Sequence, residues 1–162
     1  AIGLTGCVSK YDVAEFEGPA TKLNANSGFY VMLPKDGKYD QIDYKSSGEM
    51  TSQIASSALR KHTDKVTNAK SVESQTIAFR KARSSGLGYL FEPTILHWED
   101  RATEWSGIPD KVTIQYSVYD AKSGKKEAST IVRGSSKWAT FGGDHPQDLL
   151  TFPTEQFVEK LF

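Results

Sequence analysis

The feature that most constrains the fold of this chain is a run of strictly alternating apolar and polar residues late in the sequence. The apolar positions of this run are Val112, Ile114, Tyr116 and Val118. Alternation with a period of two predicts a β-strand with one buried face. The segment from Asp120 to Gly124 then predicts a hairpin turn with its glycine in the left-handed region, and a return strand is expected over residues 127–133. The chain is therefore expected to contain a long antiparallel hairpin.

Strand and helix patterns alternate along the rest of the chain. Residues 29–33 are apolar on both alternating faces, which is typical of a central strand that is covered on two sides. Residues 49–63 carry an apolar stripe at intervals of about four and predict a helix, with Ser47 as its cap. The other predicted elements are a strand at 66–67, a helix at 71–84, a strand at 87–98 and a helix at 154–161. Pro93 implies a bulge or an edge position within its strand.

The resulting order, β-α-β-α-β-β-β-α, predicts a single α/β domain of the α+β-like kind. A mixed β-sheet with helices packed on it is expected over residues 27–162. A chain of 162 residues is long enough to bury one substantial core.

The single cysteine lies near the start of the chain, behind a short apolar segment. Cys7 follows Leu4, Thr5 and Gly6, a run that resembles the bacterial lipobox, in which the cysteine becomes acylated. Residues 1–6 are therefore interpreted as the remnant of a lipoprotein signal peptide. Residues 7–26 are expected to be the lipidated cysteine and a flexible tether, because this segment is polar and has no clean period. The alternative is an ordinary buried thiol near the terminus.

Charge excludes one class of partner. The chain has 20 Lys and Arg against 20 Asp and Glu, so its formal net charge is zero, and no block of like charge occurs. Nucleic acid is therefore not an expected partner. Nothing beyond the first residues is apolar for long enough to span a bilayer, so the membrane is expected as a partner only through a lipid on Cys7.

Two polar stretches with aromatic residues interrupt the hydrophobic pattern. Residues 97–107 and 137–146 contain all three tryptophans and two of the three histidines of the chain. Since Lys111 and Ser135 are expected at one end of the hairpin, the two loops should emerge close together and form one surface. The candidate binding residues are His97, Trp98, Glu99, Asp100, Arg101, Glu104, Trp105, Trp138, Asp144 and His145.

These residues allow several kinds of chemistry, and none is specified by spacing. Glu99 or Glu104 with Asp144 would suit a glycan- or peptidoglycan-active hydrolase if the two carboxyl groups flank a glycosidic bond. His97, Glu99, Asp144 and His145 are acceptable metal ligands, yet no compact ligand spacing occurs. No metal, cofactor or catalytic residue is therefore assigned. A third interpretation is structural, with both loops packed on the domain as polar clusters.

The two stretches also carry a family resemblance. The matching runs are PTILHWEDRATEWSG at residues 93–107 and KWATFGGDHPQDLL at residues 137–150. With these runs the chain resembles a family of bacterial envelope lipoproteins known only as a domain of unknown function. The resemblance implies lipidation of Cys7 and export, and it implies no activity. In element order the chain is also similar to the periplasmic domains of the curli-secretion lipoprotein CsgG and the N-terminal domain of TolB, which favours a binding or assembly module over an enzyme.

Taken together, these patterns predict a lipid-anchored lipoprotein with a periplasmic domain that binds an envelope protein or a glycan. Val8 follows the cysteine, where an aspartate would favour retention in the inner membrane, so the resemblance implies the outer membrane.

Overall fold

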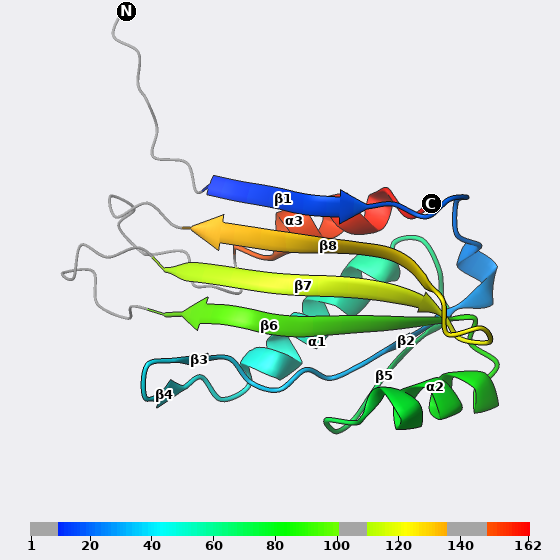
Figure 1. Cartoon of the computed structure of the whole chain (residues 1–162), viewed down its shortest axis with the longest axis horizontal. Helices are drawn as coiled ribbons and strands as arrows, with labels where there is room; N and C mark the ends of the chain where they lie inside the picture. Colours follow the sequence, from blue (N-terminus) through cyan, green and yellow to red (C-terminus); the bar gives the residue numbers. More distant parts are fainter. Residues whose placement is uncertain (1–9, 101–109, 136–148) are drawn as a thin grey trace, which may run out of the picture.

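The computed structural model describes residues 10–100, 110–135 and 149–162, which form a mixed sheet with helices on both faces (Figure 1). The sheet has six strands in the order β1-β8-β7-β6-β2-β5. The strands are β1 (Lys10–Glu17), β2 (Phe29–Val31), β5 (Val66–Asn68), β6 (Tyr89–Glu99), β7 (Lys111–Asp120) and β8 (Lys126–Ser135). A separate ribbon pairs β3 (Lys38–Tyr39) with β4 (Ile42–Asp43), and the helices are the 3-10 turn η1 (Ala25–Ser27), α1 (Ser47–Leu59), α2 (Gln75–Ser84) and α3 (Thr151–Glu159). The predicted fold class, a single mixed α/β domain, is confirmed.

Strand direction divides the sheet into two parts. The short strand β2 runs parallel to both β5 and β6, and α1 and α2 make the connections around it. From β6 through β7 and β8 to β1 every neighbour is antiparallel. The predicted hairpin is the pair β7–β8, and Gly124 in its turn has a φ of +74°, in the left-handed region that glycine adopts without steric cost.

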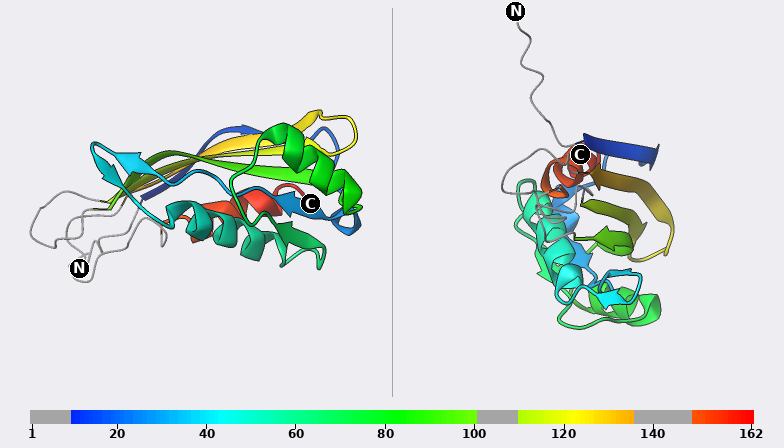
Figure 2. Two further views of the ribbon diagram at one scale, coloured as in Figure 1. Left: turned by 90° about the horizontal axis from the view of Figure 1, so that it is seen from below. Right: turned by 90° about the vertical axis from the view of Figure 1, so that its left-hand side faces the viewer.

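The helices cover the two faces of the sheet unequally (Figure 2). Helices α1 and α3 pack on one face, where the larger hydrophobic core includes Phe29, Phe91 and Phe157. Helix α2 packs on the other face over a smaller core that includes Tyr30 and Leu90. Because β2 contributes to both cores, all three of its residues are buried, as predicted for a central strand.

The alternating residues of β7 all face the larger core. Val112, Ile114, Tyr116 and Val118 are at most 1% exposed, which confirms the predicted buried face. The Tyr116 hydroxyl lies 2.6 Å from Oγ1 of Thr154 on α3. This buried hydroxyl therefore has a hydrogen-bond partner. Burial raises the pKa of Tyr116 well above its usual range.

The first turn of α1 is capped by a residue that is distant in sequence. Oδ2 of Asp36 accepts the backbone N–H of Ser46 at 3.2 Å, and its Oδ1 accepts that of Gly48 at 2.8 Å. A carboxylate at a helix N-terminus satisfies unpaired N–H groups and complements the helix dipole. The prediction that Ser47 caps the helix is wrong, since Ser47 is already helical and its Oγ accepts the N–H of Gly37 instead.

The predicted tether over residues 7–26 is wrong for Lys10–Glu17. These residues form β1, an edge strand that is antiparallel to β8 from the Lys10–Ser135 pair onward. A bulge between Ala14 and Glu17, with Glu15 at a φ of 49°, shifts the register and hides the alternation from a strict period of two. The folded domain therefore begins well before residue 27.

Pro93 occupies a position that suits its missing N–H. Strand β2 pairs with β6 only from Tyr89 to Phe91, so Pro93 lies beyond that ladder, and the bulge of β6 falls between Ile95 and His97. Within the described residues, no helix combines the length and the apolar character that crossing a bilayer requires.

Candidate functional site at the loop end of the sheet

One end of the sheet gathers the ends of four strands in a single cross-strand row, which we call the loop end. Glu99 at the end of β6 pairs with Lys111 at the start of β7, and Lys111 pairs with Ser135 at the end of β8. Lys10 at the start of β1 completes the row beside Ser135. The prediction that the two aromatic-rich stretches leave the sheet side by side is confirmed for the residues that bound them (Figure 1).

His97 and Glu99 form a polar pair at this end. Nε2 of His97 lies 2.8 Å from Oε1 of Glu99. The His97 side chain is 35% exposed, while that of Glu99 is 7% exposed. The ring of Tyr39, on β3, meets the imidazole edge-on with 5.3 Å between ring centroids. This arrangement agrees with a histidine held in a polar network.

Trp98 is a core residue, which removes it from the candidate binding surface and agrees with the structural interpretation of this residue. The residue is 2% exposed and packs in the larger core with Val112. A bulge between Ile95 and His97 explains why the Trp98 side chain points inward. Because of the bulge, Ile95 and Trp98 face the same side of the sheet although they are three positions apart. Gly37 allows the chain to approach, since a Cβ there would stand 2.5 Å from Cβ of Trp98.

Glu99 is also buried, at 5% exposure, which leaves its carboxylate little access to a ligand. Asp100 follows it at intermediate burial, and its carbonyl oxygen accepts a hydrogen bond of 3.4 Å from the Tyr44 hydroxyl. Tyr39 and Tyr44, on either side of the β3–β4 turn, therefore hold the end of β6. The two tyrosines, five residues apart in a turn-rich segment, indicate packing over a sheet edge, but the sequence does not identify β6 as the strand they contact.

The other predicted site residues lie outside the described residues. They are Cys7, Arg101, Glu104, Trp105, Trp138, Asp144 and His145. The hydrolase hypothesis pairs Glu99 or Glu104 with Asp144, so it stays a prediction. In the part of the chain that the structure describes, no three or more His, Cys, Asp or Glu side chains are placed to hold a metal ion.

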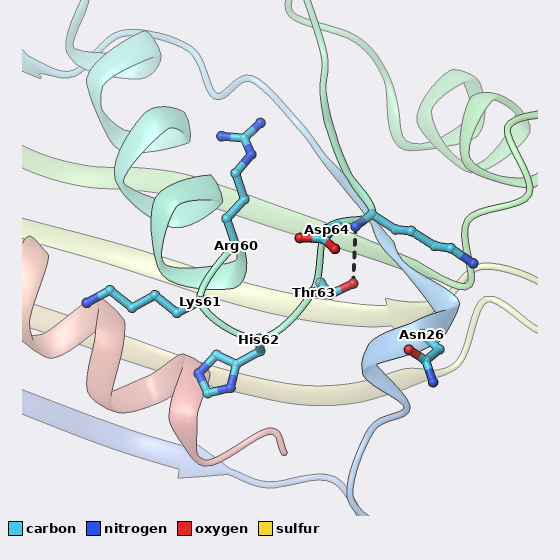
Figure 3. A pocket seen from close by; sticks show the side chains of 7 residues that line it. Asn26, Arg60, Lys61, His62, Thr63 and Asp64 are labelled. Carbon is cyan, nitrogen blue, oxygen red and sulfur yellow. Dashed lines mark hydrogen bonds between the residues drawn. The ribbon is translucent and has the colours of Figure 1, made fainter.

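A polar cavity of about 300 Å³ lies at the opposite end of the sheet, where α1 ends (Figure 3). Its lining residues are Asn26, Arg60, Lys61, His62, Thr63, Asp64 and Lys65. Lys61 pairs with Glu155 at 2.7 Å, Arg60 donates to Asn68 at 3.2 Å, and His62 stacks on Phe162. Arg60 thus joins the end of α1 to β5, Lys61 joins it to α3, and His62 packs on the last residue, so these side chains have structural roles.

The fold is similar to those of solved bacterial proteins. The PelC dodecamer from Paraburkholderia phytofirmans matches at a TM-score of 0.71 with 14% sequence identity, covering 95% of this chain and 97% of that chain. Protein XCC0632 from Xanthomonas campestris, of the family DUF330, matches at a TM-score of 0.53 with 10% identity, covering 81% of each chain. At these identities the likeness establishes the fold.

In sequence, no curated protein matches the chain. Residues 21–161 match the family described as "Domain of unknown function (DUF4823)". That range covers most of the chain, including β2, the three helices and the hairpin β7–β8. The protein therefore belongs to the DUF4823 family, as the resemblance to a domain of unknown function predicted.

Proposed function

We propose that this protein is a lipid-anchored lipoprotein of the bacterial outer membrane whose periplasmic domain is a non-enzymatic assembly module. The observation that carries the proposal is the short distance in sequence between Cys7 and β1. Only Val8 and Ser9 separate Cys7 from Lys10, the first residue of the sheet. Three residue steps span at most about 11 Å, so a lipid on Cys7 would hold the loop end close to the bilayer.

This anchoring gives the domain an orientation. The strands would rise from the membrane, with the loop end and the β3–β4 ribbon below and the turn of β7–β8 above. Asp100 and Ser135, the described residues that precede the stretches 101–109 and 136–148, would then lie on the membrane side of the domain. A partner that binds there would itself be embedded in, or lie against, the membrane.

The assembly role has support from the fold. The protein named as the PelC dodecamer shares the fold over nearly the whole of both chains, and it is an assembly of many copies. We infer that copies of this chain assemble at the membrane surface.

Substitution of the cysteine tests the anchor. The protein is expressed in a bacterium behind an export leader, labelled with radioactive palmitate, and followed by membrane fractionation. The wild-type chain is expected to carry label and to sediment with outer membranes, whereas Cys7→Ser is expected to be unlabelled and to appear in the soluble periplasm.

Val8→Asp provides a matched control one residue away. It keeps the acylated cysteine but introduces the residue that favours inner-membrane retention in enterobacteria. We expect a labelled protein that shifts to the inner membrane. An unlabelled wild-type chain, or a Cys7→Ser chain that stays membrane-bound, would contradict the proposed anchor.

A further inference from the structure

The two lateral margins of the domain carry opposite charge. Strand β1 forms one margin of the sheet, with β8 as its neighbour. Its acidic residues Asp12, Glu15 and Glu17 are all exposed, against one lysine in the strand. Phe16 lies among them, 37% exposed. We call Asp12, Glu15, Phe16 and Glu17 the β1 edge.

Strand β5 is the opposite edge of the sheet, and α2 with the segment that precedes it lies along that side of the domain (Figure 1). Helix α2 contains Arg80, Lys81 and Arg83 and no acidic residue, and Lys70 lies just before it. All four cations are exposed. Two exposed apolar residues accompany them, Val72 at 50% and Ile77 at 42%. We call these six residues the α2 side.

Some of these charges have partners within the domain. Asp12 lies 3.6 Å from Arg133, Lys81 pairs with Glu73, and Arg83 donates to the carbonyl of Ala121 at 3.0 Å. In the described part of the chain, Glu15, Glu17, Lys70 and Arg80 make no ion pair. Nζ of Lys160 lies 4.7 Å from the centroid of the Phe16 ring, so one cation also stands at the β1 edge. Each margin still keeps charge that is available to a partner, next to a partly exposed apolar side chain.

The two margins also lie at a similar height along the strands. Glu17 belongs to the cross-strand row that continues through Ser129 and Ser117 to Glu92. Oε1 of Glu92 accepts a hydrogen bond of 3.0 Å from Gln75, the first residue of α2. The acidic end of β1 and the start of α2 therefore belong to the same level of the sheet.

We propose that a second copy of this chain is the partner of both margins, with the β1 edge of one copy docked on the α2 side of the next. This proposal rests on the assembly role proposed above and identifies its interface. Opposite charges steer and select such a contact, and Phe16 with Val72 and Ile77 supplies an apolar centre. An edge-to-edge pair of two β1 strands is disfavoured, because it would bring acidic residues together.

This head-to-tail contact is compatible with anchoring every copy in one membrane. Each copy presents one β1 edge and one α2 side, so the contact repeats and closes into a ring if the rotation allows. A rotation axis parallel to the strands keeps all loop ends, and therefore all copies of Cys7, on the same side. The remaining unpaired edge of β1 would be covered in the assembly.

Charge reversal on each margin tests the interface. One variant carries Glu15→Lys with Glu17→Lys, and the other carries Lys70→Glu with Arg80→Glu. Self-association of the full lipidated chain in detergent is measured by sedimentation velocity over a range of concentrations. Each variant alone is expected to associate at least about tenfold more weakly than the wild type, because like charges then face each other.

Mixing the two variants supplies the decisive comparison. In an equimolar mixture every contact again joins opposite charges, so association should return towards the wild-type level as alternating copies. Arg60→Glu with Lys61→Glu, at the end of α1 on one face of the sheet, changes the net charge as much as the α2-side variant does. This control is expected to associate like the wild type.

The outcomes separate the two proposals. A wild-type chain that stays monomeric at every concentration would contradict the assembly role, and the interface with it. A wild-type chain that assembles, together with reversed variants of unchanged affinity or a mixture that does not recover, would overturn the interface and leave the assembly role standing.

Discussion

At the scale of single residues, neighbours in one polar run have different roles. His97, Trp98 and Glu99 are consecutive, yet the imidazole is partly exposed while the indole and the carboxylate are buried. A tryptophan among charged residues suggests an exposed contact surface when only the sequence is considered. The bulge in β6 and the absence of a side chain at Gly37 direct Trp98 into the core instead.

Truncation of this indole should therefore lower stability. Trp98→Ala is expected to decrease the free energy of unfolding by about 3–5 kcal/mol, because it empties a fully buried site. Urea denaturation measures the change. Leu96→Ala is the matched control, since Leu96 is two residues away and 50% exposed, and its effect should stay near about 0.5 kcal/mol. A Trp98→Ala chain of normal stability would show that the indole is not part of the core.

The site was only partly predictable at this scale. The sequence indicates which residues collect at the loop end, and the pairing of Lys111 with Ser135 confirms where their stretches begin. It does not indicate which side chains are buried, because a one-residue bulge reverses the direction of every residue after it. The contacts of Tyr39 and Tyr44 with β6 join segments more than fifty residues apart, which no local pattern reveals.

At the scale of elements, strong hydrophobic periodicity predicts the helices and strands correctly, whereas an irregular strand gives no pattern that predicts it. The alternation in β7, the turn glycine and the apolar stripe of α1 each identified their element. Strand β1 shows no local strand pattern, because its bulge breaks the alternation and because its exposed residues are mostly polar. The cap of α1 comes from Asp36, ten residues away, so it could not be recognised as an adjacent capping residue.

The turn of β7–β8 offers a prediction about pH. Oδ1 of Asp120 accepts the backbone N–H groups of Lys122 at 2.9 Å and Ser123 at 2.8 Å. Hydrogen bonding from Ser123 lowers the pKa of Asp120, so the folded state holds the charged carboxylate more strongly than the unfolded state. Asp120→Ala is expected to destabilise the domain by about 1–2 kcal/mol at neutral pH.

Acid should remove that difference. The unfolded carboxyl has a pKa of about 3.9, so the stabilisation is complete above that value and disappears as the pH falls through the lower pKa of the folded state. Urea denaturation of both proteins from pH 7 down to pH 3 measures this loss, with Lys125→Ala as a control on the same turn. A difference between wild type and Asp120→Ala that is constant over this range would contradict the account.

At the scale of the whole molecule, the start of β1 decides how the domain meets the membrane. A flexible tether would let the domain take any orientation at a distance from the bilayer. A sheet that begins three residues after the lipid would instead hold one end near the bilayer and the other end away from it. The same geometry keeps the β1 edge and the α2 side lateral, where neighbouring copies can meet.

Energy transfer to the membrane surface measures this orientation directly. Since Cys7 is the only cysteine and would be acylated, a cysteine introduced at Gln41 or at Lys122 takes a donor dye alone, and acceptor dyes are placed on lipid headgroups. Gln41 lies at the β3–β4 turn, by the loop end, and Lys122 lies at the far turn, beyond the ten residues of β7.

Ten strand residues span about 33 Å, so the two labels should differ clearly in their distance from the bilayer. We expect strong transfer from Gln41→Cys and weak transfer from Lys122→Cys. Equal transfer from both labels, or stronger transfer from Lys122→Cys, would contradict a domain that stands on its loop end at the membrane.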